Sequence, residues 1–243
     1  MKQFFWLHIK KAGGLSTRKL LSPHYKEVDR VKKPKNFIQS DRDEYNDILN
    51  NYRVVLGEYQ FKRCLFAKKY LYPNEWDNIY SFAFSREPID RCISMFFYLF
   101  WGGAGFMSSI KRFIDVFYSH KRAVLSTSSA FDLFLDLVCE ARESESNYSP
   151  LGLHFSTHTA DVWDDITDFD GNILLSRIYR LDSLVEGINH VFEMCDIQNR
   201  IDKCDVYINK NKSRTIFIPS RSQVKKIEDL FSKDFDIYEN AWH

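Results

Sequence analysis

The sequence predicts an α/β fold: a single domain over residues 1–243 with a mainly parallel central sheet that is flanked by helices. Short apolar runs with the length of buried strands alternate with segments of helical spacing, which is the order typical of a parallel sheet. Two of these runs lead through a short turn directly into the start of a helix. A chain of 243 residues is also long enough to bury a sizeable core.

The first strand–turn–helix unit is Phe4–Leu21. The apolar run Phe4–Ile9 precedes the loop Lys10–Gly14, and a helix is expected to begin at Ser16. Two glycines let the backbone approach an anion, and a helix N-terminus favours negative charge. The pattern predicts a phosphate-binding loop to which Lys11 brings a positive charge. A plain strand–turn–helix with solvated lysines fits the local pattern equally well.

The next part of the chain supplies two more strands and two helices. Ser22–Asn46 is polar and interrupted by prolines, so we expect a loop there. A second strand is expected at Tyr52–Gly57, followed by helical spacing over Phe61–Tyr70. The third strand is Ile79–Phe84, and a helix follows over Pro88–Trp101, because proline suits the first helical turn.

The remainder of the chain is mainly helical. Further helices are expected at Met107–His120, Ser128–Arg142, Ser183–Met194 and Ser220–Phe231, and a late strand at Ile173–Arg180. We expect Thr127 or Ser128 to cap the second of these helices and Asp182 to cap the third. Two segments show no clear period: Leu153–Trp163, rich in His, Thr and Ser, and Asp234–His243, interpreted as a tail.

Composition bounds the class of protein. With 34 Lys and Arg against 33 Asp and Glu, the net charge is +1, so any basic site is local. Attraction to bulk nucleic acid or to a membrane surface is not expected. No apolar run reaches the ~18 residues of a membrane span, and Met1 lies close before the first strand. We therefore expect a soluble, cytoplasmic protein without a signal peptide.

Cysteine usage is typical of reduced thiols. The chain has five cysteines, an odd number, and no CxxC pair. Most lie among apolar residues, which favours buried, reduced thiols over a disulfide framework. Neither a zinc site nor another bound metal is expected.

A second candidate anion site lies at the end of the third strand, in Ser85–Pro88. Arg86 would stand at the carboxyl end of that strand, and Ser94 lies eight residues later on the following helix. An arginine and a serine so placed can hold a second phosphate by charge-assisted hydrogen bonds. The alternative is that Arg86 forms an ion pair with Glu87 or Asp90.

Together, HIKKAGGLST and FSREPIDRCIS resemble the two signature segments of sulfotransferases that use 3′-phosphoadenosine 5′-phosphosulfate (PAPS). The first is similar to the 5′-phosphosulfate loop, commonly H-x-P-K-T-G-G-T-S, and the second to the 3′-phosphate motif R-[DE]-P-x-x-R-x-x-S. The nearest branch is the carbohydrate sulfotransferases related to heparan-sulfate enzymes. Lys10, Ala12 and Leu15 depart from the first pattern, where the family has proline, threonine and threonine.

The resemblance implies PAPS as sulfonate donor, no metal, and a P-loop-like phosphosulfate loop after the first strand. It implies that Lys11 contacts the phosphosulfate bridge and that Arg86 and Ser94 hold the 3′-phosphate. The loop residues implied to cradle the 5′-phosphate, some through their backbone alone, are Ala12, Gly13, Gly14, Leu15, Ser16 and Thr17. Arg214, in the basic loop NKNKSR, is a further candidate for the nucleotide site.

Glu58 is expected to act as the general base, and a second segment offers rival candidates. Related enzymes often carry a His or Glu where this chain has Glu58, at the end of the expected second strand. His154 and His158 in GLHFSTHT are the rival bases or acceptor-binding groups. Several aromatic residues suit stacking on a sugar or phenol, although such residues more often form a core: Phe96, Phe97, Tyr98, Phe100 and Trp101.

The resulting hypothesis is an enzyme that transfers a sulfonate group from PAPS to a hydroxyl of an acceptor, with a saccharide as one class and an amine as second choice. One alternative is a P-loop-type nucleotide kinase. That loop needs Lys immediately before Ser or Thr, whereas Lys11 precedes the glycines. The other alternative is a nucleotide- or sugar-binding module without turnover.

Overall fold

The computed structural model describes residues 4–24, 56–101, 126–143, 152–202 and 217–242. Within these ranges three parallel strands form one sheet in the order β1 (Phe4–Leu7), β2 (Tyr80–Ser85), β3 (Arg177–Arg180). Leu7 is in register with Ala83, and Ser85 with Arg180, so the carboxyl ends of the strands meet at one edge. The predicted α/β class with a parallel sheet is confirmed for this part of the chain.

Each strand leads into a helix. α1 (Gly14–Leu21) follows β1, and α4 (Pro88–Phe96) follows β2 and continues as the π-helical turn η7 (Phe97–Trp101). After β3, the short 3₁₀ turn η8 (Leu181–Ser183) leads into α9 (Leu184–Met194). At the start of α4, Glu87 accepts hydrogen bonds from two first-turn N–H groups and Pro88 occupies the first turn, as expected for this residue pair.

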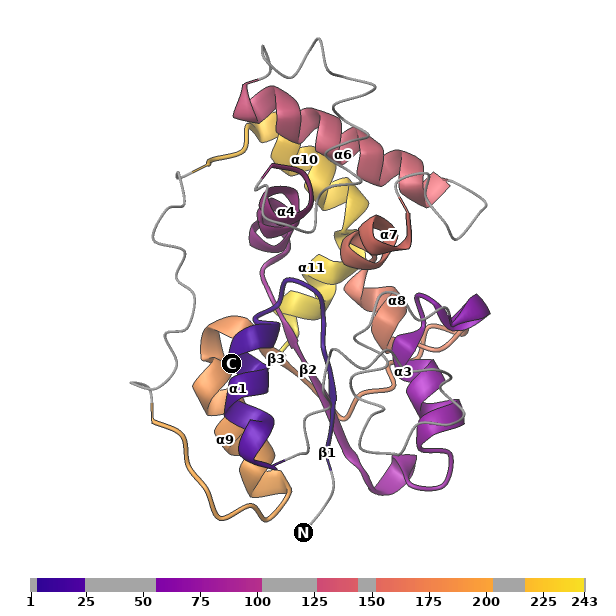
Figure 1. Cartoon of the computed structure of the whole chain (residues 1–243), viewed down its shortest axis with the longest axis vertical. Helices are drawn as coiled ribbons and strands as arrows, with labels where there is room; N and C mark the ends of the chain where they lie inside the picture. Colours follow the sequence, from indigo (N-terminus) through magenta and orange to yellow (C-terminus); the bar gives the residue numbers. More distant parts are fainter. Residues whose placement is uncertain (1–3, 25–55, 102–125, 144–151, 203–216, 243) are drawn as a thin grey trace.

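The sheet separates two apolar cores. Alternate residues of the strands face opposite sides, with Phe5 and Leu7 in one core and Phe82 and Tyr179 in the other. α1 and α9 cover the second face, while α3 (Arg63–Phe66), its π-helical continuation η5 (Ala67–Leu71) and α8 (Val162–Ile166) lie on the first (Figure 1). All six residues of β2 are buried, in agreement with its central position.

A third core lies beyond the carboxyl ends of the strands (Figure 1). There α4 packs with α6 (Thr127–Glu143), α7 (Leu153–Thr159) and α10 (Arg221–Leu230). The chain then returns towards the sheet in α11 (Ser232–Glu239). This helical layer therefore stands over the edge at which a ligand of a parallel sheet binds.

The sequence did not reveal every helix. Leu153–Trp163, which shows no clear period, contains α7 and the start of α8. Its polar side chains bond back to carbonyls one turn earlier: Thr157 to Leu153 at 2.6 Å and Thr159 to Phe155 at 2.9 Å. These bonds stabilise a short helix that has no apolar period to reveal it.

The caps and the tail also differ. Ser126 caps α6 through the N–H of Ser129, in place of Thr127 or Ser128. Asp182 caps no helix, because its carboxylate accepts a hydrogen bond from the Tyr238 hydroxyl at 2.6 Å. The expected tail from Asp234 forms most of α11, and Asp234 itself is buried.

Other expectations fall outside the described residues. These are most of the loop Ser22–Asn46, Tyr52–Val55 of the second strand, Met107–His120, Arg214 and Cys204. Gly57 begins the 3₁₀ turn η4 (Gly57–Tyr59). Among described cysteines, Cys64, Cys92 and Cys195 are buried and Cys139 is partly buried, all as free thiols.

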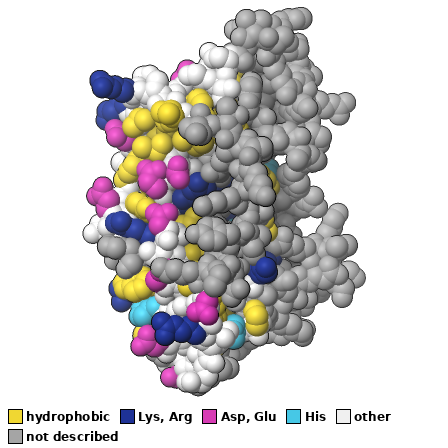
Figure 2. Space-filling model, turned by 90° about the vertical axis from the view of Figure 1, so that its left-hand side faces the viewer, with side chains coloured by type: hydrophobic (Ala, Val, Ile, Leu, Met, Phe, Trp, Pro, Cys, Tyr) yellow, Lys and Arg dark blue, Asp and Glu magenta, His cyan; other side chains and the backbone are white. Residues whose placement is uncertain are grey.

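The described surface matches the balanced composition. On the face drawn in Figure 2, acidic, basic and hydrophobic side chains are interspersed over the described residues. In the same part of the chain, no helix is long and apolar enough to span a membrane.

Candidate functional site

The loop between β1 and α1 presents the N-terminus of a helix. Lys11 and Gly13 both have positive φ, of 64° and 73°, which turns the backbone sharply before the helix. Thr17 closes the turn, with its N–H and its hydroxyl both donating to the Gly13 carbonyl, at 3.0 and 3.2 Å. The first N–H groups of α1, from Gly14 on, have no acceptor within their own helix, and its first turn carries no acidic residue. This geometry suits an anion.

Close packing explains the two adjacent glycines. A Cβ atom on Gly14 would lie 1.7 Å from Nε2 of His8, and one on Gly13 would lie 2.3 Å from Cδ1 of Leu181. Each position therefore admits only glycine without rearrangement of its neighbour. His8, directly after β1, braces the start of α1.

Two buried arginines hold the carbonyl groups of this loop. Arg63 donates from Nη1 to the His8 carbonyl at 3.3 Å, and Arg91 donates from Nε to the Lys10 carbonyl at 3.2 Å. Both side chains are almost fully buried. These two carbonyl groups of the loop are therefore held from inside the protein.

Each of these arginines is paired with a buried aspartate. Arg63 binds both carboxylate oxygens of Asp165, and Arg91 binds Asp234 at 2.9 Å. A buried charge is tolerated when it is paired and hydrogen-bonded in this way. Neither pair was apparent from the sequence, since the partners lie 102 and 143 residues apart.

Lys11 lies in the same cluster as the two histidines of α7. Its ammonium nitrogen is 3.9 Å from the ring centroid of Tyr98 in η7. The Tyr98 ring stacks on His158, with 5.2 Å between centroids, and His154 lies 4.1 Å from His158 by the same measure. The structure thus brings together three of the predicted catalytic candidates, and 41% of Tyr98 is exposed beside them.

His158 is held as a neutral base. Its Nδ1 donates to the His154 carbonyl at 2.8 Å, because a carbonyl oxygen only accepts. In the neutral ring the lone pair is therefore on Nε2. Burial lowers the pKa of His158 well below 6.5, and the nearby His154, Lys10 and Lys11 lower it further. At pH 7 this imidazole is therefore neutral.

Positive charge surrounds the loop. Burial of the His8 ring lowers its pKa well below its ordinary value, and the charges of Lys10, Arg18 and Arg63 lower it further. Two buried polar atoms near the strand ends, Nδ1 of His8 and Oγ of Ser85, make no hydrogen bond within the described part of the chain. Unsatisfied buried polar atoms in an electropositive setting are consistent with a polar, anionic ligand.

The second predicted anion site is built differently. Arg86 follows β2 directly and pairs with Asp90 at 3.2 Å, while Glu87 caps α4 instead. The Asp90 side chain is 62% exposed, so water competes for this ion pair. Ser94 is buried on α4. Of the two arrangements considered from the sequence, the structure shows the ion pair between Arg86 and Asp90. A phosphate that binds Arg86 would displace Asp90 from this pair.

Glu58 lies elsewhere. It is exposed in η4, next to Tyr59, whose hydroxyl accepts a hydrogen bond from Lys69 at 2.7 Å. In the described residues, the contacts that join Lys11 to His158 do not include Glu58. Arg214 lies outside the described residues.

Sequence reasoning missed the two residues that connect the site. Tyr98 was one of several aromatic residues for which a place in the core was favoured, and its position beside Lys11 distinguishes it. Arg91 matches a motif position, but its burial and its three partners could not be inferred from spacing.

No group of three or more His, Cys, Asp or Glu is placed to hold a metal ion within the described residues. In the comparisons with known proteins, no family, no curated protein and no solved structure matches this chain.

Proposed function

We propose that this protein is a PAPS-dependent sulfotransferase that transfers a sulfonate group to a hydroxyl of an acceptor. The observation that carries the proposal is the joint placement of the loop before α1, Lys11 and the neutral imidazole of His158. A sulfonate-transfer site needs these three parts: a phosphate cradle, a cation at the leaving oxygen and a base for the acceptor.

The loop would bind the 5′ end of the donor. First-turn N–H groups of α1 take the 5′-phosphate, with the hydroxyl group of Ser16 beside them, while the Thr17 hydroxyl closes the turn on the Gly13 carbonyl. Arg86 and Ser94 take the 3′-phosphate once Arg86 leaves Asp90. The glycines let His8 and Leu181 pack against the loop, which supports its conformation before α1.

The chemistry follows from the cluster around Tyr98. Nε2 of His158 accepts the proton of the acceptor hydroxyl as its oxygen forms a bond to sulfur. The bond between sulfur and the bridging oxygen breaks, and its electron pair stays on that oxygen. The Lys11 ammonium stabilises the negative charge that develops there. The tautomer of His158 supports it as the base ahead of Glu58, and His154 shapes the acceptor side.

Calorimetric titration with adenosine 3′,5′-bisphosphate (PAP), the product nucleotide, tests the binding half of this proposal. We expect saturable binding to the full chain and weaker binding by Lys11→Ala. Lys19→Ala, which removes an exposed lysine from the far part of α1, is the matched control and should bind as the wild type does. Absence of PAP binding, or equal loss in the two variants, would contradict the proposed site.

A further inference from the structure

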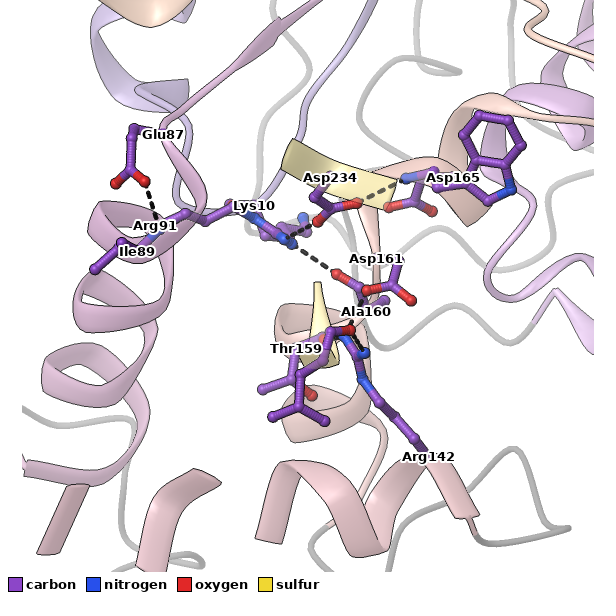
Figure 3. Close-up of polar contacts among 12 residues, drawn as sticks. Lys10, Glu87, Ile89, Arg91, Arg142, Thr159, Ala160, Asp161, Asp165 and Asp234 are labelled. Carbon is purple, nitrogen blue, oxygen red and sulfur yellow. Dashed lines mark hydrogen bonds and ion pairs between the residues drawn. The ribbon is translucent and has the colours of Figure 1, made fainter. Parts of the chain in front are cut away.

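One guanidinium group joins three segments of the chain. Arg91 extends from α4 and donates to the Lys10 carbonyl at 3.2 Å, to the Ala160 carbonyl at 2.7 Å and to Asp234 at 2.9 Å (Figure 3). Its side chain is only 2% exposed. All three nitrogen atoms of the group are thus engaged, each with a different segment.

Two of these segments carry the proposed reacting groups. Lys10 directly precedes Lys11 in the loop, and Ala160 follows His158 by two residues at the end of α7. The planar fork of an arginine holds several acceptors at fixed relative positions, which a lysine ammonium cannot do. The fork of Arg91 therefore fixes the loop relative to the helix that carries His158.

Asp234 fixes the fork in turn. One carboxylate oxygen of Asp234 accepts from Arg91, and the other accepts from the Trp163 N–H at the start of α8, at 3.1 Å. The end of α7 has a second support in Arg142, which donates to the Thr159 carbonyl at 3.2 Å and pairs with Asp161 (Figure 3). Arg142 does not reach the loop in the described structure, so Arg91 alone of these two arginines connects both halves of the site.

We propose that Arg91 is a positioning residue that sets the place of Lys11 relative to His158, and so joins the donor half of the site to the acceptor half. The inference rests on the proposed function. It explains why a buried arginine that is already paired with an aspartate donates hydrogen bonds both to the loop and to the end of α7.

Arg91→Lys is the direct perturbation and Arg63→Lys its matched control. Both arginines are buried, paired with an aspartate and bonded to a loop carbonyl, and in the described structure Arg91 in addition donates to the Ala160 carbonyl at the end of α7. Misplacement of reacting groups by about 1 Å can lower turnover ~100-fold. We therefore expect Arg91→Lys to lower kcat about 100-fold with a much smaller change in PAP affinity. Arg63→Lys should weaken PAP binding more than it lowers kcat.

A second readout does not depend on activity. The pKa of His158, followed by NMR in the full chain and assigned with His158→Gln, should rise towards 6.5 in Arg91→Lys as water reaches the loosened end of α7. It should stay low in Arg63→Lys. Asp234→Asn keeps the size of the side chain and should also raise the pKa of His158. It replaces Arg91→Lys in this test if Arg91→Lys unfolds. Each kcat is normalised to PAP-binding sites, so loss of folded protein does not imitate the effect.

The possible outcomes distinguish the positioning role of Arg91 from the proposed function of the protein. If the wild type binds PAP and turns over, but the Arg91 and Arg63 variants show equal kcat and an equal His158 pKa, the positioning role is wrong and the function stands. If the wild type neither binds PAP nor transfers sulfonate, the proposed function fails. The NMR comparison then still decides whether Arg91 fixes α7.

Discussion

Replacing Gly14 with alanine should destabilise the protein, although alanine normally favours a helix. Gly14 is the first residue of α1, and its φ lies outside the left-handed region, so alanine would gain up to about 1 kcal/mol in an open helix. Here the added Cβ would lie 1.7 Å from Nε2 of His8. Ordinary carbon contacts begin near 3.5 Å, so the imidazole would have to move by about 2 Å.

The His8 ring has little room for that movement. It stacks on Trp6, with 5.2 Å between centroids, and Arg63 holds its backbone carbonyl. Overpacking of this kind typically costs about 1–3 kcal/mol, which exceeds the helical gain. For a domain of this size each kcal/mol lowers Tm by about 2–4 °C. PAP affinity should fall as well, because the first turn of α1 is displaced.

A double-mutant cycle measures the contact. Thermal and urea unfolding are followed for the wild type, Gly14→Ala, His8→Ala and the double variant. His8→Ala removes the ring, so the double variant should be more stable than the sum of the single effects predicts. Gly57→Ala is the control: it has positive φ and nothing within 4 Å of its Cβ, so its cost is backbone strain that His8→Ala should not relieve. A Gly14→Ala protein as stable as the wild type, or additive effects, would refute the close packing of this loop.

Four further predictions concern the reaction and the binding of the donor. His158→Gln should lower kcat by about 10²–10⁴ while Glu58→Gln does less, measured by steady-state kinetics; the reverse order would move the base to Glu58. Because the pKa of His158 lies below 6.5, its imidazole stays neutral from pH 8 to 6.5. We therefore expect kcat to fall only at lower pH. A fall in kcat centred above pH 7 would exclude His158, in its described environment, as the base. Arg86→Ala should weaken PAP more than 5′-AMP, by about 1.5–3 kcal/mol for a lost charge-assisted bond, and calorimetry showing equal losses would remove Arg86 from the 3′-phosphate site. Turnover should survive excess chelator, because Lys11 supplies the positive charge; strict magnesium dependence would favour the kinase alternative.

Where local signals are strong, the sequence predicted the structure well. The apolar runs of β1 and β2, the proline at the start of α4 and the Ser220 cap of α10 each determine an element through short-range chemistry. The Ser220–Gln223 capping box satisfies both partners within one turn. Elements of this kind need no tertiary contact to be recognised.

Elements that depend on distant partners were missed. α7 has no apolar period, and its buried polar side chains are tolerated because they bond back to its own carbonyls. The segment from Asp234 was interpreted as a tail, but Asp234 is buried and Arg91 compensates its charge in the interior.

As with the fold, the parts of the candidate site that depend on local pattern could be predicted from the sequence, and the parts that depend on distant contacts could not. The glycine loop with Lys11 follows from local pattern, and the structure confirms the strand–loop–helix order around it. The position of His158 beside Lys11 depends on the packing of α4 and η7 against α7, which spacing does not reveal. The same is true of Arg91, whose three acceptors come from three separate segments.

Transfer of label from radiolabelled PAPS to a panel of phenols and oligosaccharides tests the central claim most directly. The full chain is compared with Lys11→Ala and Lys19→Ala, and PAP is added as a competitor. We predict labelled product with the wild type and with Lys19→Ala, suppression by PAP, and a loss of about 10²–10³ in rate with Lys11→Ala. PAP binding without label transfer to any acceptor, or label transfer that Lys11→Ala leaves unchanged, would contradict the account.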